Sequence, residues 1–291
     1  MRPSTEEELA EIVRGAAGPL RIRGGGTRAI GRTDGAPLET AGLAGVRLYE
    51  PGALTLVAGA GSPLGEIEAM LAAEGQRLPF EAPDLRGLLG REGVSTLGGV
   101  VAANGSGPRR IQTGACRDSL IGVRFVDGVG QVVKNGGRVM KNVTGYDLVK
   151  LMAGSHGTLG VLSEVAFKLL PLPETELTLA LPDLAPERAV EAMAAALGSP
   201  FDVSGAAHWP GRGTFLRIEG FEASVRYRAE RLRRLLTGFG EAAEVESPWA
   251  AIRDVAPFHG REGDVWRLSL KPSEAPAVAA RAGGGGALRL G

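Results

Sequence analysis

Hydrophobic and polar residues recur along the chain with two different spacings, which predicts a mixture of helices and strands. Leu9, Ile12 and Val13 share one face of an opening helix that Ser4 or Thr5 would cap. Apolar runs of strand length then alternate with helical patterns. We expect strands just before Gly24 and at 161–169, 175–181, 214–220 and 265–270, and a strand followed by a helix within 54–74. A hairpin is expected within 120–133. Further helices are expected at 146–153, 185–197 and 221–236.

Two prolines, Pro171 and Pro173, follow the strand expected at 161–169, and the composition changes after them. We therefore place a domain boundary near residue 173. Residues 1–173 form one predicted domain and residues 174–291 a second, in which strands and helices alternate as in a small α+β layer. The glycine-rich end of the chain, RAGGGGALRLG, carries no pattern of a terminal helix or strand.

The segment with the most distinctive chemistry is the run GVSTLGGVVAANGSG, from Gly93 to Gly107, which has five glycines and no charge. Glycines let backbone N–H groups come close to a polyanion, so the run is typical of a phosphate-binding loop. The apolar residues between the glycines indicate that the run is buried, Val94 included. A buried turn without a ligand explains the same pattern, and this segment alone does not decide between the two.

A second glycine pattern, Gly59, Gly61 and Gly65, follows the strand expected after Leu54. The spacing is one residue too long for the G-x-G-x-x-G fingerprint of dinucleotide-binding folds. A simple strand-to-helix turn, with Pro63 near the first turn of the helix, is the better interpretation.

Composition limits the classes of function. Of 291 residues, 44% are hydrophobic and 23% charged, as in ordinary globular proteins. The 33 basic and 33 acidic residues cancel, which argues against a nucleic-acid binder. Cys116, the single cysteine, excludes an internal disulfide and any cysteine-ligated zinc or iron–sulfur site within this chain. No signal peptide or membrane-spanning run is recognised, so we expect a cytoplasmic protein.

Three loops together carry a family resemblance: RIRGGGT (Arg21–Thr27), GVSTLGGVVAANGSG and GSHGTLGVLSEV (Gly154–Val165). Their order and spacing resemble the FAD-binding domain of the vanillyl-alcohol oxidase or p-cresol methylhydroxylase (PCMH) superfamily. The patterns SGPRR, G..RD, GG..MKNV.GYDL and GTLGV are similar to the smaller FAD-binding subunit of bacterial glycolate oxidases. The resemblance implies an α+β chain with a two-subdomain PCMH-type FAD-binding domain (1–173) and a smaller α+β cap domain (174–291), truncated at its C-terminus.

The resemblance also assigns FAD-binding residues. The first loop would bind the pyrophosphate through Arg23, Gly24, Gly25, Gly26 and Thr27. Other segments would contact the pyrophosphate, ribityl chain, flavin ring and adenine through Pro83, Gly93, Ser95, Thr96, Gly98, Gly99, Asn104, Ser106, Gly107, Gly114, Arg117, Asp118, Gly157, Thr158, Gly160 and Val161. Relatives with covalent FAD have a histidine where Thr27 stands, so noncovalent FAD is implied. Arg117 and Asp118 fit a plain structural ion pair equally well.

The sequence leaves the substrate side open. His156, His208 and His259 have no metal-ligand spacing, so we expect no metal site. His156 fits a surface loop better than a proton relay. In residues 174–291 only Arg212, Arg217, His208 and His259 are candidates for substrate contact, and Arg217 occupies an alternating strand position that we expect to be exposed. The catalytic residues stay unknown.

The resemblance implies an FAD-dependent oxidoreductase subunit that takes part in the oxidation of glycolate, a small 2-hydroxy acid, to glyoxylate. Its implied partners are a larger FAD-linked oxidase subunit and an iron–sulfur subunit, through which the complex would be membrane-associated. Two alternatives remain: a non-catalytic assembly subunit that keeps the flavoprotein fold, or a stand-alone FAD oxidoreductase for another alcohol or 2-hydroxy acid.

Overall fold

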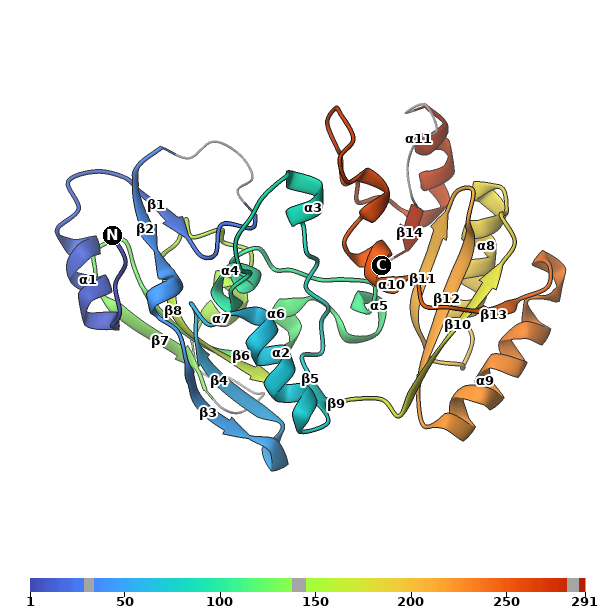
Figure 1. The fold of residues 1–291 in the computed structure, drawn as a ribbon, viewed down its shortest axis with the longest axis horizontal. Helices are drawn as coiled ribbons and strands as arrows, with labels where there is room; N and C mark the ends of the chain where they lie inside the picture. The colour runs from blue at the N-terminus through green and yellow to red at the C-terminus, as the bar shows by residue number, and fades with distance from the viewer. Residues whose placement is uncertain (29–33, 138–144, 282–287, 291) are drawn as a thin grey trace. The chain divides into compact units, whose positions relative to one another are not determined.

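The computed structural model describes residues 1–28, 34–137, 145–281 and 288–290. The chain divides into two compact units, which are described separately (Figure 1). The first unit holds Met1–Gly107 and Thr113–Leu172, and the second holds Pro108–Gln112 and Pro173–Gly291. The assignment of 1–173 and 174–291 as functional domains stays a prediction.

The first unit is built around a five-stranded antiparallel sheet with the order β3-β4-β8-β6-β7. These strands are β3 (Val46–Glu50), β4 (Thr55–Gly59), β6 (Leu120–Val126), β7 (Val132–Gly136) and β8 (Val161–Lys168). Two pairs of short strands accompany the sheet: the parallel pair β1 (Leu20–Arg23) and β2 (Ala36–Glu39), and the antiparallel pair β5 (Gln76–Arg77) and β9 (Leu170–Pro171).

Helices and sheet share one large apolar core in this unit. It joins Leu56, Val165 and Phe167 of the sheet to residues of α2 (Leu64–Ala73), α4 (Leu97–Ala102) and α7 (Leu148–Met152). A smaller core packs α1 (Glu6–Arg14) against β1 and β2 (Figure 1). Shorter elements of this unit are α3 (Arg86–Leu89), α6 (Cys116–Ser119) and the 3₁₀ turns η1 (Thr40–Gly42) and η2 (Pro51–Ala53), whereas most of α5 (Arg110–Thr113) belongs to the second unit.

The second unit has the element order β-α-β-β-α-β, a known supersecondary pattern. Its antiparallel sheet has the order β13-β10-β12-β11-β14. The elements are β10 (Thr175–Leu181), α8 (Pro186–Leu197), β11 (Val203–Trp209), β12 (Gly213–Gly220), α9 (Glu222–Leu235), β13 (Ala243–Val245), α10 (Trp249–Arg253), α11 (Ala275–Arg281) and β14 (Leu288–Leu290), with 3₁₀ turns at η3 (Thr237–Phe239), η4 (Ala256–Phe258) and η5 (Pro272–Glu274).

One face of this second sheet carries the large apolar core, and the other carries the polar side chains of Arg217 and Glu219 beside a smaller apolar cluster. Leu179 and Leu216 of the sheet share this core with residues of α8 and α9, the two helices that Figure 1 shows beside the sheet. The alternate residues of β12 face the other way, toward Trp249 of α10. Arg217 lies on that face with 1% of its surface exposed, so the expectation that it is exposed is wrong. Strand alternation predicts two faces, but it does not tell which other segment covers the polar one.

Most predicted elements are confirmed. Thr5 caps α1 by accepting from the Glu8 N–H, the strand and helix within 54–74 are β4 and α2, and the 120–133 hairpin is β6 and β7. The strand expected at 265–270 is wrong: this segment has no strand pairing in the described chain, and Trp266 is 80% exposed. Several strands were not predicted: β2, β3, β11, β13 and the terminal β14, together with the two-residue strands β5 and β9. The helix expected at 146–153 is shorter, because Asp147 caps α7.

Candidate functional site

The first loop and the central run touch through their backbones. The loop Gly24–Thr27 follows β1 directly. A Cβ at Gly25 would lie 1.5 Å from the Val94 carbonyl oxygen, and a Cβ at Gly93 would lie 2.1 Å from the Gly25 carbonyl oxygen. No side chain fits at either position, so glycine is what allows the two segments to meet. Gly93 and Val94 are exposed at this meeting point, against the prediction of a fully buried run.

The amides of the first loop are suited to bind an anion. Within the described part of the chain, the N–H groups of Gly25, Gly26 and Thr27 have no hydrogen-bond acceptor. Gly26 has a left-handed φ of 76°, and the Arg23 guanidinium occupies the space that a Cβ at Gly26 would need. Successive free amides in a turn of this kind form a concavity that binds phosphate. The Thr27 and Ser95 hydroxyls, 3.5 Å apart, place further hydrogen-bonding groups beside these amides.

The central run serves mainly to pack α4 tightly. The Gly98 N–H donates to the Ala60 carbonyl at 2.7 Å, and a Cβ at Gly98 would lie 2.7 Å from the Ala60 Cβ. Thr96 caps the helix by accepting from the Gly99 N–H at 3.3 Å, and its hydroxyl lies where a side chain at Gly24 would be. The amides of Gly98 and Gly99 therefore already have acceptors within the protein. The absence of side chains at Gly24 and Gly98 lets α4 pack close to the first loop.

The residues after the central run stabilise its end. The Asn104 side-chain oxygen accepts from the Arg117 N–H at 3.0 Å, and Asp118 accepts from the Ala115 N–H at 2.8 Å at the start of α6. Arg117 and Asp118 are 3.8 Å apart with side chains about half exposed, a pair of little energetic weight. A Cβ at Gly114 would strike the Asp118 carboxylate. A structural role accounts for all of these contacts.

The third loop is joined to both of the others. The N–H groups of Gly154 and His156 donate to the Val101 and Ala102 carbonyls of α4, at 3.0 and 2.9 Å. A Cβ at Gly157 would lie 3.1 Å from Ile22 of β1. The three loops predicted to surround one cofactor therefore lie next to one another within the first unit. His156 itself is exposed.

Ser155, which no sequence pattern indicates, has a hydroxyl without a partner in the described residues. Its residue is 9% exposed, and its Oγ has no hydrogen-bond partner in the described chain. Next to it, the Thr158 hydroxyl donates to the Ser155 carbonyl at 2.7 Å. Buried hydroxyls are normally paired, so an unpaired one among these loops suggests a missing partner. Free amides and a free hydroxyl together fit a phosphate-bearing, hydrogen-bonding cofactor such as FAD.

The remaining predicted cofactor residues lie at the same three loops or next to them. The Pro83 carbonyl accepts a hydrogen bond from Arg28, Ser106 and Gly107 are buried, and Val161 begins β8 behind Gly160. The roles of all these residues toward FAD stay predictions.

The substrate candidates of the second unit are held in separate structural contacts. His208 is buried beside the Thr214 hydroxyl at 3.0 Å, and this burial lowers the pKa of its imidazole. Arg212 stacks on Trp209, and His259 bonds to the Asp254 carbonyl. Arg217 stacks under Trp249, 4.9 Å from the ring. The four do not form a site together.

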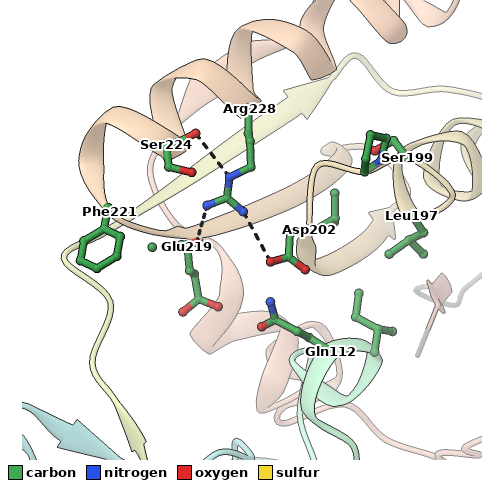
Figure 2. A pocket seen from close by; sticks show the side chains of 12 residues that line it. Gln112, Leu197, Ser199, Asp202, Glu219, Phe221, Ser224 and Arg228 are labelled. Carbon is green, nitrogen blue, oxygen red and sulfur yellow. Dashed lines mark hydrogen bonds and ion pairs between the residues drawn. The ribbon is translucent and has the colours of Figure 1, made fainter.

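An open hollow of about 670 Å³ lies in the second unit where β12 meets α9. Figure 2 shows the Arg228 guanidinium bound to the main-chain oxygens of Ser224 and Glu219 and paired with Asp202. The Glu219 carboxylate is itself paired with Arg109 at 2.6 Å. Because the cations here already bond to the protein's own oxygens, the hollow is a poor site for a substrate carboxylate.

Comparison with known proteins agrees with the geometry of the first unit. Residues 1–136 match the family model of an FAD binding domain. Glycolate oxidase subunit GlcE of Escherichia coli K12 is 38% identical over 263 residues, which cover 89% of this chain and 71% of that subunit. The chain belongs to the GlcE family of FAD-binding proteins.

Other matches to this GlcE-family chain are partial. Glycolate oxidase subunit GlcD of Bacillus subtilis is 44% identical over 86 residues, 30% of this chain and 18% of that protein. A solved structure of alkyldihydroxyacetonephosphate synthase superposes with a TM-score of 0.69 at 19% identity, covering 89% of this chain and 54% of the synthase. The synthase match shows the fold alone, and the chain spans about half of the synthase's length.

Two further observations concern partners and metals. None of the helices in the described residues has the length and apolarity that crossing a bilayer requires. The same residues contain no group of three or more His, Cys, Asp or Glu side chains placed to hold a metal ion.

Ser155→Ala separates a ligand role of this hydroxyl from a structural one. Because the Oγ has no partner in the described chain, removing it should leave the stability of the apoprotein unchanged or slightly higher. FAD affinity should fall by roughly three- to tenfold, the value of one hydrogen bond. Titration of apoprotein with FAD, together with thermal unfolding, measures both.

Ser119→Ala is the matched control for this change. Ser119 is also buried, but its hydroxyl donates to the Cys116 carbonyl at 3.1 Å. This variant should lose about 1 kcal/mol of stability and bind FAD normally. Unchanged FAD affinity in Ser155→Ala would show that the hydroxyl does not face the cofactor.

Proposed function

We propose that this chain is the FAD-bearing GlcE-type subunit of a glycolate oxidase complex, and that it takes part in the flavin-dependent oxidation of glycolate to glyoxylate. The observation that carries the proposal is the meeting of three loops, in a chain of the GlcE family, whose amides and buried hydroxyl have no partner among the described residues. The proposed partners are a GlcD-type flavoprotein subunit and an iron–sulfur subunit. The complex would be cytoplasmic, with any membrane association supplied by its partners.

Bound FAD would supply the acceptor for the two electrons and the hydrogen that leave a 2-hydroxy acid. The chain's own residues would bind and orient it. The amides of Gly25 and Gly26 bind the pyrophosphate, the Ser155 hydroxyl hydrogen-bonds to the cofactor, and α4 keeps the first and third loops in place. Thr27 cannot form the covalent link that a histidine forms, which supports noncovalent binding.

One observation favours the alternative of an assembly subunit without turnover of its own. The candidate substrate residues of the second unit are dispersed, and Arg109, Arg217 and Arg228 are engaged by oxygens of the protein. A substrate carboxylate therefore has no ready cationic partner among them. In this alternative the GlcD-type subunit would carry out the oxidation.

Co-expression with the GlcD-type and iron–sulfur partners tests the proposal. We expect a complex in which this chain carries FAD. Glycolate should bleach the flavin of this complex, and a dye acceptor should reoxidise it, so that glycolate is oxidised continuously. A complex in which this chain holds no flavin would contradict the proposal. Full glycolate turnover by a complex whose GlcE-type chain cannot bind FAD would favour the assembly subunit.

A further inference from the structure

Arg28 lies between two segments that no predicted role connects. It follows the first loop directly, and its guanidinium donates to the Pro83 carbonyl at 2.5 Å. On its other side the guanidinium fills the space next to Gly105, where a Cβ would lie 3.2 Å from its Nη1. Pro83 is in one segment assigned to FAD, and Gly105 is in the central run between two other assigned residues.

The central run is rigid where Arg28 meets it. The Gly105 N–H donates to the Val100 carbonyl at 2.9 Å, and its own carbonyl accepts from the Cys116 N–H at 3.2 Å. The Pro83 segment has no regular secondary structure, and its neighbours belong to no helix or strand until α3 begins at Arg86. The backbone at Gly105 is held by hydrogen bonds, whereas the backbone at Pro83 is irregular. The arginine therefore connects the irregular Pro83 segment to a backbone that is already held in place.

The charge of Arg28 acts inside this part of the fold. Burial raises the pKa of the Cys116 thiol far above its ordinary range, and the positive charge of Arg28 is the largest influence in the opposite direction. The side chain of Cys116 is fully buried. The guanidinium is therefore close to the buried end of the central run rather than extended into solvent.

We propose that Arg28 is a positioning residue of the FAD site, which holds the Pro83 segment at a fixed distance from the central run at Gly105. The inference rests on the proposed FAD site and adds a residue to it. An arginine suits this task because its planar head carries several donors and can reach two segments at once, whereas a lysine has a single point of contact. A Cβ at 105 would press on the guanidinium, 3.2 Å from its Nη1, so a side chain there would displace it by a few tenths of an ångström.

The test compares FAD affinity with the stability of the apoprotein in the full-length chain. Arg28→Gln should weaken FAD binding about tenfold, the value of a charged hydrogen bond, and should change the visible circular dichroism of the bound flavin. Arg28→Lys should recover part of the affinity. The melting temperature of the apoprotein should change by less than about 2 °C in both, since the brace orders a site rather than a core.

Two further variants make the test specific. Gly105→Ala alone should weaken FAD binding. Combined with Arg28→Gln, it should cause no further loss of FAD affinity, because both substitutions act on the same contact. Arg21→Gln is the control, because Arg21 is an exposed residue of β1 that is not among the residues assigned to FAD. This variant should bind FAD like wild type.

Three results would overturn the inference. The first is FAD affinity within twofold of wild type in Arg28→Gln, with an unchanged spectrum. The second is an equal loss in the lysine and glutamine variants, together with a lower melting temperature of the apoprotein, since that pattern indicates general destabilisation. The third, failure of the wild-type chain to bind FAD, would overturn the proposed FAD site as well, and is distinguished by the wild-type titration alone.

Discussion

Gly25→Val leaves the chain without bound FAD. A Cβ at this position would lie 1.5 Å from the Val94 carbonyl oxygen, so the first loop and the central run must separate by more than 1 Å. The free amides of the loop then no longer face the site as one group. We expect at least a hundredfold loss of affinity, about 2.7 kcal/mol or more, in a titration of apoprotein with FAD.

Gly18 provides the matched control for this change. It precedes the same strand, and a Cβ there meets nothing within 4 Å, so Gly18→Ala should bind FAD like wild type. Gly93→Ala should reproduce the loss from the opposite side of the contact, because its Cβ would lie 2.1 Å from the Gly25 carbonyl oxygen. Wild-type affinity in Gly25→Val would contradict the close approach of the two loops and the site built on it.

Arg109→Met lowers the free energy of unfolding of the second unit by about 3–5 kcal/mol. Arg109 binds the Glu219 carboxylate with two hydrogen bonds, of 3.0 and 2.6 Å, and both side chains are less than 10% exposed. Removing the guanidinium leaves a buried carboxylate whose nearest remaining cation, Arg217, is 3.6 Å away. Urea unfolding followed by far-ultraviolet circular dichroism measures the loss.

Arg226→Met is the control for Arg109→Met, because its pair with Glu222 is exposed and should contribute less than about 0.5 kcal/mol. An equally small loss in Arg109→Met would show that the buried pair contributes little.

The same ion pair sets a pH dependence. Burial alone would raise the pKa of Glu219, but the hydrogen bonds and charge of Arg109, with the charge of Arg217, hold it at about 2. The unfolded carboxyl titrates near pH 4.3. A lowered pKa stabilises the folded state above pH ~4.3, and this contribution of roughly 3 kcal/mol is lost as the pH falls toward 2. In Arg109→Met the loss between pH 4 and 2 should be smaller.

The sequence predicted elements well where the local pattern decides them. The alternating apolar residues of β10 and the alanine-rich α8 each carry a clear period, and both formed as expected. β11 was missed because its sequence VSGAAHW is rich in small residues, which form a strand here only by pairing with β12 on one side and β14 on the other. The reverse error occurred at 265–270, where alternation is present but a partner strand in the described chain is not.

Some residues of the candidate site could likewise be predicted from the sequence, and others could not. The glycines of three loops are visible in the sequence, because close backbone approach requires that residue type wherever it occurs. Ser155 and Arg28 carry no such signal. The first matters because its hydroxyl is buried without a partner in the described residues, and the second because Pro83, far away in sequence, comes within hydrogen-bond distance. Arg217 was misjudged because Trp249 covers it from outside its own strand.

We propose above all that three loops of one chain build one noncovalent FAD site. The most direct measurement is the flavin content of the full chain, separated from its co-expressed partners under native conditions and then denatured. The account predicts one FAD per chain in the native state, bleached by dithionite and released on denaturation, and its absence in Gly25→Val. A wild-type chain without flavin, or flavin that stays attached after denaturation, would contradict it.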